Sequence, residues 1–496
     1  MREKLSSRRG ALLVVGVLAA LTVFLQLTSS AWPLRRSGGA STIDSRIDPG
    51  LTGSFSAGTG APVALEARLD RTAVLQGGDG LVRMELAIRA VGRPALSAER
   101  VPTDLVVVLD RSGSMSGSKI EHARQATRLV VDSLADGDRF ALVTYAGDAA
   151  LTIPLAEASP AARARWIQTI AGTGAGGGTN ISNALDLALA TLERAQRPGR
   201  AARLILISDG QANQGDVTLE GLSERARRAA RAESVLSAVG VGEDFNETLM
   251  AALADAGTGN YYYLRNAEEL ARVFESEFKA TRTTLADALS VTLTPGPHVT
   301  VADVAGYPLE RAAGRVSFRP GSLYAGQERR VWVSYHVASA EPGSRDLGGV
   351  ELSWKDTRGQ AASLALASRP AVTCVRDEAA FVASIDKDVW EDSVVKEAYG
   401  ALKQRVAGYV MQGDRAAARQ EIEAYRARNS VLNEEVQSPA VMDNLQELSH
   451  LESDVDDAFA GAPEERKAKQ NRLSKKSQAE GWDSRREGSK LVEGGR

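Results

Sequence analysis

Three oxygen-bearing side chains stand at alternate positions where an apolar run of the chain ends. The run "LVVVLD" finishes with Asp110, and Ser112 and Ser114 follow in the next loop. Gly113 and Gly117 allow that loop to bend sharply, so that alternate side chains direct their oxygens to one point. One carboxylate and two hydroxyls form a hard-oxygen ligand set, which suits Mg²⁺ rather than zinc or copper.

Two more oxygen-bearing residues occupy similar places further along the chain. Thr179 comes in "GGGTN", just before a segment with helical periodicity, and Asp209 ends the buried-strand pattern "LILISD". Ligands of open α/β sheets bind beyond the carboxyl ends of the strands, so we expect both residues to join the first three in one metal site. Mg²⁺ prefers a near-octahedral shell and usually retains water. Only some of the five side chains would then touch the ion, and at least one position would stay open.

The glycines before Thr179 allow a second interpretation. Gly172, Gly174 and Gly177 have the G-x-G-x-x-G spacing of a dinucleotide-binding turn, which needs a strand immediately before it. Here "PAARARWIQTIA" precedes them, and its apolar residues recur at helical spacing. The pattern therefore favours a loop that turns Thr179 toward the metal over one that cradles a pyrophosphate. A G-x-x-x-x-G-K-[ST] phosphate loop is also missing from the sequence, which leaves ATP binding without support.

The elements that would position these loops lie between residues 104 and 283. Continuous apolar runs such as "RFALVTYA" and "RLILISD" alternate with segments of helical spacing such as "ISNALDLALATLERA". Apolar runs of this kind are typical of parallel strands that are buried on both faces. We therefore predict an α/β domain at 104–283 with a doubly wound, mostly parallel sheet.

The flanking segments predict different structures. Alternating apolar and polar residues at 61–103 and 284–375 predict short strands, and we expect one β-sandwich in which the α/β domain is inserted or which flanks it. Helical spacing returns at 376–460. The Gly- and Ser-rich stretch 37–60 is typical of a flexible linker. The charged end, 461–496, has almost no apolar residues and is expected to be disordered.

Composition and the N-terminus limit the class of protein. The net charge is −3 and the pI about 6.0, so no global field favours nucleic acid. Cys374 is the single cysteine, which excludes an internal disulfide and indicates a small core residue. Residues 1–36 combine a basic start with the uncharged apolar run 11–27, the pattern of an export signal or membrane anchor. The bulk of the chain is then expected outside the cytoplasm, anchored in the inner membrane and facing the periplasm, or secreted after cleavage.

The ordered motifs resemble those of the von Willebrand factor type A (vWA) domain. "VVVLDRSGSM", "GGGTN" and "ILISDGQAN" are similar to bacterial vWA proteins of the exported or membrane-anchored type. All five positions match the metal-ion-dependent adhesion site of integrin I domains. The resemblance implies that Ser112, Ser114 and Thr179 are direct or switchable ligands of Mg²⁺ or Mn²⁺, while Asp110 and Asp209 act largely through water. It also implies that a partner protein supplies an Asp or Glu carboxylate to the open position.

Three functions follow from these observations. The first is a non-enzymatic, adhesion- or scaffold-type protein that binds its partner through the divalent ion, with membrane attachment if residues 11–27 are retained and no nucleic-acid partner. The second is an envelope serine hydrolase that uses Ser112 or Ser114, although "GSMSG" places Met115 at the centre of a would-be G-x-S-x-G elbow. The third is a vWA subunit that works with an ATPase. Short polar loops also cap helices, so Ser116, Ser118 or Thr179 could serve that role alone.

Overall fold

The computed structural model describes residues 53–57, 62–91, 102–195, 200–242, 245–264, 284–356 and 360–485. All of them belong to one unit of the chain, residues 45–496. The predicted signal or anchor at 1–36 lies outside the described residues. Within the part that is described, none of the helices combines the length and the hydropathy that crossing a bilayer requires.

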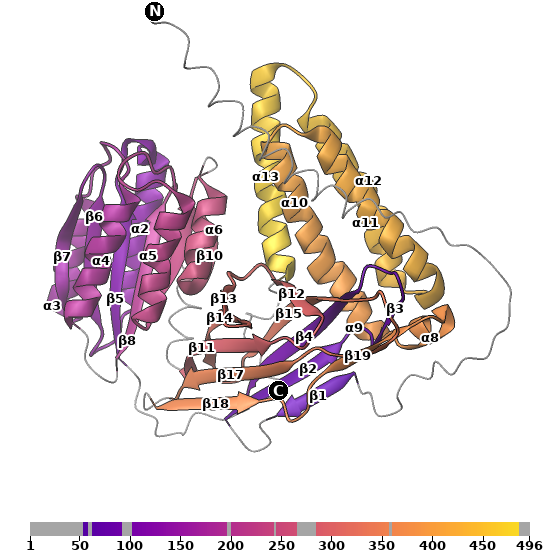
Figure 1. Cartoon of the computed structure of the whole chain (residues 1–496). Helices are drawn as coiled ribbons and strands as arrows, with labels where there is room; N and C mark the ends of the chain where they lie inside the picture. Colours follow the sequence, from indigo (N-terminus) through magenta and orange to yellow (C-terminus); the bar gives the residue numbers. More distant parts are fainter. Residues whose placement is uncertain are drawn as a thin grey trace, which may run out of the picture. The chain divides into compact units, whose positions relative to one another are not determined.

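Residues 103–264 form a six-stranded sheet with helices on both faces (Figure 1). The strand order is β10-β9-β8-β5-β6-β7, in which β7 alone runs antiparallel to its neighbour. The strands are β5 (Thr103–Asp110), β6 (Arg139–Tyr145), β7 (Ala149–Glu157), β8 (Ala201–Ser208), β9 (Ser234–Val241) and β10 (Thr258–Leu264). The helices are α2 (Ser118–Ser133), α3 (Pro160–Ala171), α4 (Ile181–Ala195), α5 (Leu219–Arg231) and α6 (Glu247–Ala256). The predicted doubly wound, mostly parallel sheet is confirmed.

Strand β5 shows why continuous apolar runs predict this architecture. Leu105, Val107 and Leu109 pack against α2 and α3, whereas Val106 and Val108 pack against α4, α5 and α6 on the opposite face. Every residue of β5 is buried. Because β5 lies at the centre of the sheet between β8 and β6, its carboxyl end reaches the middle of the loop cluster beyond the sheet.

Two antiparallel sheets share the core of a β-sandwich. One has the order β1-β2-β4-β15-β12 and the other β13-β14-β11-β17-β18. The strands before the α/β domain are β1 (Ser54–Ala57), β2 (Val63–Leu69), β3 (Ala73–Leu75) and β4 (Leu81–Ala90). Those after it are β11 (Thr284–Thr294), β12 (Val299–Val304), β13 (Glu310–Ala312), β14 (Arg315–Tyr324), β15 (Glu328–Val337), β16 (Gly343–Asp346), β17 (Gly349–Lys355), β18 (Ala361–Ala365) and β19 (Ala371–Val375).

The α/β domain is an insertion in this sandwich. Leu86 of β4 pairs with Val331 of β15, so strands that come before and after the inserted domain are direct neighbours. A small third sheet also joins strands from before and after the inserted domain, because β19 pairs in parallel with β3 at Thr373 and Ala73. Cys374 is buried in the shared core.

The linker expected at 37–60 is wrong for its last part. Strand β1 occupies Ser54–Ala57 and pairs antiparallel with β2, with Phe55 opposite Ala67. Phe55 also packs against the sandwich core. A single aromatic residue among glycines and serines was too weak a signal to predict an edge strand.

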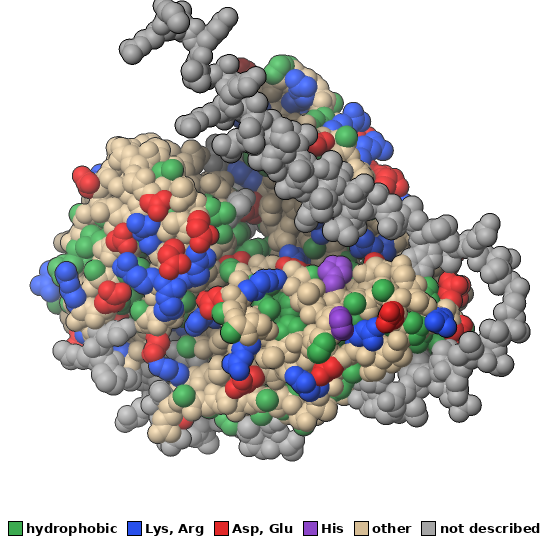
Figure 2. Space-filling view, viewed as in Figure 1, with side chains coloured by type: hydrophobic (Ala, Val, Ile, Leu, Met, Phe, Trp, Pro, Cys, Tyr) green, Lys and Arg blue, Asp and Glu red, His purple; other side chains and the backbone are tan. Residues whose placement is uncertain are grey.

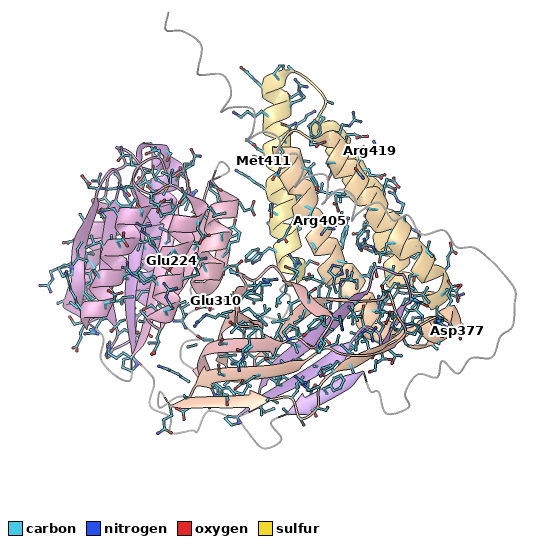
Figure 3. All side chains as sticks on the ribbon, in the orientation of Figure 1. Glu224, Glu310, Asp377, Arg405, Met411 and Arg419 are labelled. Carbon is cyan, nitrogen blue, oxygen red and sulfur yellow. The ribbon has the colours of Figure 1, made fainter. Side chains whose placement is uncertain are left out.

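The helical region follows the sandwich and has a core of its own. Its helices are α8 (Glu378–Ala383), α9 (Lys387–Asp392), a π-helical turn (Ser393–Ala398), α10 (Tyr399–Met411), α11 (Arg415–Val436), α12 (Pro439–Ala458) and α13 (Pro463–Arg485). On their exposed sides, Arg405 of α10 pairs with Glu421 of α11, and Arg419 of α11 pairs with Asp456 of α12. Figure 3 labels Arg405 and Arg419 on these helices.

The disorder expected for the charged tail is wrong for 463–485, which form α13. The helix buries one large apolar residue, Leu473, and otherwise mostly small residues, among them Ser474, Ser477 and Gly481 at helical spacing. Gly481 and Gly400 of α10 lie so close that a Cβ on Gly481 would come within 2.5 Å of the Gly400 carbonyl oxygen. Helices with small residues at their contact can pack closely without an apolar stripe, and a count of apolar residues does not detect this.

Candidate functional site

Asp110 ends β5 and is completely buried at the beginning of the serine loop. Its Oδ1 accepts a hydrogen bond from the backbone N–H of Ser112 at 2.8 Å. Its Oδ2 accepts hydrogen bonds from the hydroxyls of Ser208 at 2.6 Å and Tyr145 at 3.2 Å. Burial raises the pKa of Asp110 above its usual range, and the negative charge of Asp209 acts in the same direction. A nearby cation would oppose that shift.

Ser208 and Tyr145 are site residues that the sequence analysis missed. Tyr145 ends β6 directly opposite Asp110 in the parallel register, and Ser208 ends β8 on the other side of β5. Both are the last residues of strands, and this position was the signal in the sequence that could have identified them as site residues. To identify them from this signal, one must know the strand order, which places β6 and β8 on the two sides of β5.

The serine loop continues as a short 3₁₀ helix, Gly113–Met115, before α2 begins. Met115 is fully buried and fixes the loop to the core below. The hydroxyls of Ser112 and Ser114 lie 3.0 Å apart, with Ser112 buried and Ser114 exposed. The two hydroxyls therefore converge on one point at the boundary between protein and solvent.

The glycine-rich loop is attached to the serine loop through backbone hydrogen bonds. Gly113 N–H donates to the carbonyl oxygen of Gly177 at 3.0 Å, and Gly176 N–H donates to that of Arg111 at 2.7 Å. Gly177 has φ +92°, and a Cβ there would lie 3.2 Å from the Ala146 side chain. Helix α3, and not a strand, comes before these glycines, so the unit required for a dinucleotide-binding turn is missing.

Thr179 is held between the glycine-rich loop and the loop after Asp209. Its N–H donates to Asn213 Oδ1 at 2.9 Å, and its carbonyl oxygen accepts from the N–H groups of Asn213 at 3.0 Å and Gln214 at 3.2 Å. The side chain of Thr179 is buried. Asn213 is thus a third residue that the sequence analysis missed; its only signal was its place four residues after Asp209.

Asp209 is fully buried at the end of β8. Its Oδ2 lies 3.2 Å from the ammonium group of Lys119, which is near the start of α2. Its Oδ1 is also buried, and it has no hydrogen-bond partner among the described residues. A buried carboxylate oxygen without a donor is destabilising, unless water or a cation supplies the missing interaction.

These contacts bring together the loops that carry the five predicted residues. The donor set comprises two carboxylates and three hydroxyls, which matches the ligands of Mg²⁺ or Mn²⁺. Metal clusters built from three or more His, Cys, Asp or Glu side chains do not occur among the described residues. The residues present therefore fit a hard divalent ion, and Asp209 Oδ1 is a buried carboxylate oxygen in this loop cluster that such an ion or a water could satisfy.

The geometry gives little support to serine hydrolysis. Among the described residues, the hydroxyl of Ser112 bonds to that of Ser114, and neither bonds to a histidine. A serine nucleophile normally needs such a base within hydrogen-bonding distance.

The surface away from the site carries charges of both signs. Arg225 of α5 pairs with Asp186 of α4 at 3.0 Å, and Arg227 pairs with Glu224 at 2.8 Å. Figure 2 shows positive and negative side chains interspersed over the face that carries α4 and α5. This face therefore has no extended basic patch of the kind that binds a nucleic-acid backbone.

The fold and the converging loops define a von Willebrand factor type A domain. The family model of that name matches residues 104–276, and this part of the chain belongs to the family. Domains of this family are generally protein-interaction modules. The solved structure described as von Willebrand factor type A from Catenulispora acidiphila has the same fold, with a TM-score of 0.57 at 19% identity over 82% of this chain and 91% of that one.

Two relatives show how widely the domain is used. The uncharacterized protein YfbK of Escherichia coli is 30% identical over 206 residues, which are 41% of this chain and 36% of YfbK. Inter-alpha-trypsin inhibitor heavy chain H4 of Bos taurus is 29% identical over 164 residues, or 32% of this chain and 18% of that protein. This chain therefore aligns with only about a third of the length of YfbK, and with less of the bovine protein.

Proposed function

We propose that the chain is a metal-dependent binding protein of the adhesion or scaffold type, and that its vWA domain acts by binding and not by catalysis. The proposed ligands of the divalent ion, Mg²⁺ or Mn²⁺, are Asp110, Ser112, Ser114, Thr179 and Asp209. When bound, the ion supplies a positive centre that attracts an Asp or Glu carboxylate of a partner protein. The basic start and apolar run of residues 1–36 support a location outside the cytoplasm, with or without membrane attachment.

One observation carries this proposal. The buried Asp209 Oδ1 has no protein donor and belongs to the same loop cluster as the paired hydroxyls of Ser112 and Ser114. Structural capping would satisfy such oxygens with backbone N–H groups, as it does for Asp110 Oδ1. An oxygen that capping leaves unsatisfied, in the same loop cluster as the hydroxyls of Ser112 and Ser114, is better explained by an external cation.

The residues have separable roles in this proposal. The hydroxyls of Ser112, Ser114 and Thr179 are neutral and would contact the ion directly. Asp110 already accepts three hydrogen bonds from protein groups, so it would act through its charge and by orienting the serine loop. Because Lys119 pairs with Asp209, the dication would outweigh the remaining negative charge, and the site would become positive once the ion binds. A positive site would favour a partner carboxylate.

The test is calorimetric titration of Mn²⁺ into the full chain and its Asp110→Ala variant. We expect binding to weaken about 10- to 100-fold, the range for residues that orient metal ligands. Asp132→Asn, an exposed carboxylate on α2 that pairs with Arg128, is the matched control and should bind as the wild type does. Capture of partners from envelope extract with Mg²⁺, but not with EDTA, tests the protein-binding step. Equal Mn²⁺ affinity of Asp110→Ala and wild type would show that the site is misassigned.

A further inference from the structure

Lys119 places a positive charge inside the candidate metal site. Its ammonium nitrogen lies 3.2 Å from Asp209 Oδ2, and its side chain is only 20% exposed. Asp209 itself is fully buried. The two groups form an ion pair that is largely shielded from solvent, in which charges interact more strongly than on an open surface.

A glycine beside the Lys119 side chain leaves room for it. Gly242 follows the end of β9 with φ +84°, and a Cβ there would come within 2.5 Å of Lys119 Cε. The aliphatic part of Lys119 thus lies along a position where a larger residue would displace it. The stem of Lys119, which α2 carries, is therefore packed against the segment that follows β9.

Lys119 neutralises one of the two carboxylates and leaves one oxygen of that carboxylate without a hydrogen-bond partner among the described residues. Asp110 is satisfied by Ser112, Ser208 and Tyr145, all of them uncharged. Among the described residues, Lys119 is the positively charged side chain that pairs with either carboxylate. It binds Asp209 through Oδ2 only, and Oδ1 has no hydrogen-bond partner there.

We propose that Lys119 is an internal competitor of the divalent ion and lowers the affinity of the site for it. This inference rests on the proposed function. A dication that approaches Asp209 is repelled by the positive charge of Lys119, which already pairs with Asp209 Oδ2. The ion must either displace Lys119 or bind beside it, and both are unfavourable. Because Oδ1 stays available, the competition weakens binding without preventing it.

The test compares Mn²⁺ affinity of the full chain with that of Lys119→Met, which removes the charge and keeps most of the stem. We expect the variant to bind Mn²⁺ about tenfold more tightly or better. Lys119→Arg retains the charge and should stay near the wild type. A purely structural role would not produce tighter binding, because a disturbed site loses affinity.

A second measurement needs no metal. With EDTA present, Lys119→Met should unfold at a lower temperature than the wild type, since Asp209 is left buried without its cation. Saturating Mn²⁺ should then raise the melting temperature of Lys119→Met by more than that of the wild type. If Lys119→Met does not fold, Lys119→Gln is measured in the same way.

The outcomes separate this inference from the proposed function. Mn²⁺ binding by the wild type, together with equal or weaker binding by Lys119→Met, overturns the competitor role and leaves the metal site intact. Binding by neither protein at millimolar Mn²⁺ overturns both. Binding by the variant alone supports the inference in its strongest form.

Discussion

At the scale of single residues, the site depends on side chains that hold the candidate ligands in place. Thr179 is fixed by three hydrogen bonds to the segment after Asp209, and two of them involve Asn213. Asn213 is exposed, so its contribution to the core is small. Its role is therefore better explained by the hydrogen bonds that hold Thr179 in position than by packing.

Replacement of Asn213 by alanine should therefore weaken Mn²⁺ binding by about tenfold, the effect typical of residues that orient metal ligands. The lost hydrogen bond should lower the free energy of unfolding by only about 1 kcal/mol. Calorimetry and urea denaturation measure the two effects. Asn213→Asp keeps the acceptor for Thr179 N–H and should not lose affinity. An alanine variant with wild-type affinity would show that Thr179 does not need this support.

At the scale of elements, the glycine-rich loop links α3 to the serine loop through its backbone. The loop is also held from α2, where Arg124 Nε donates to the carbonyl oxygen of Thr173 at 2.7 Å. Because these contacts use backbone atoms, the path of the loop matters more than its side chains. Gly177 is a position where that path disfavours other residues, through both its φ of +92° and the contact that a Cβ would make with Ala146.

Gly177→Ala should lower the free energy of unfolding by about 1–3 kcal/mol, since an alanine at this φ is strained. Gly174→Ala is the matched control in the same loop, because a Cβ there has open space and its φ lies outside the left-handed region. Urea denaturation of both variants gives the difference. Equal stabilities would show that the loop accommodates the strain by moving.

The sequence predicts the loops of the site better than their surroundings. Asp110 and Asp209 were found because strand ends are visible as the last residues of apolar runs. Tyr145, Ser208 and Lys119 were not, because their contacts depend on the strand order and on the path of α2 beside β9, which spacing along the chain does not encode. Strand β1 and helix α13 were missed because local composition reports only apolar content. It reports neither the pairing of a short edge strand, as in β1, nor the close packing of small residues, as in α13.

At the scale of the whole described structure, a buried ion network joins the sandwich to the helical region. Arg485 of α13 donates to Glu397 of the π-helical turn at 2.7 Å and also pairs with Asp303 of β12. The side chains of Arg485 and Glu397 are 7% and 3% exposed. Burial raises the pKa of Glu397 above its usual range, whereas the charge of Arg485 acts in the opposite direction. The carboxylate therefore depends on this arginine.

Arg485→Met should lower the free energy of unfolding by about 3–5 kcal/mol, because it removes the cation that bonds directly to the buried Glu397. The second change in Arg485→Met/Glu397→Gln should restore part of that loss. Arg405→Met removes an exposed ion pair with Glu421 and should stay close to the wild type. Thermal unfolding monitored by circular dichroism compares the variants. A small effect of Arg485→Met would indicate that water replaces the arginine.

The pairing of β4 with β15 also has a consequence for biosynthesis. Strand β4 of the sheet β1-β2-β4-β15-β12 ends at Ala90, and its neighbour β15 begins only at Glu328. During translation, residues 103–264 can complete their own sheet while one edge of β4 still awaits its neighbour. An open strand edge is a template for pairing with other chains. During synthesis, the unpaired edge of β4 is therefore a site at which the chain can aggregate. This risk ends when β15 is synthesised and pairs with β4.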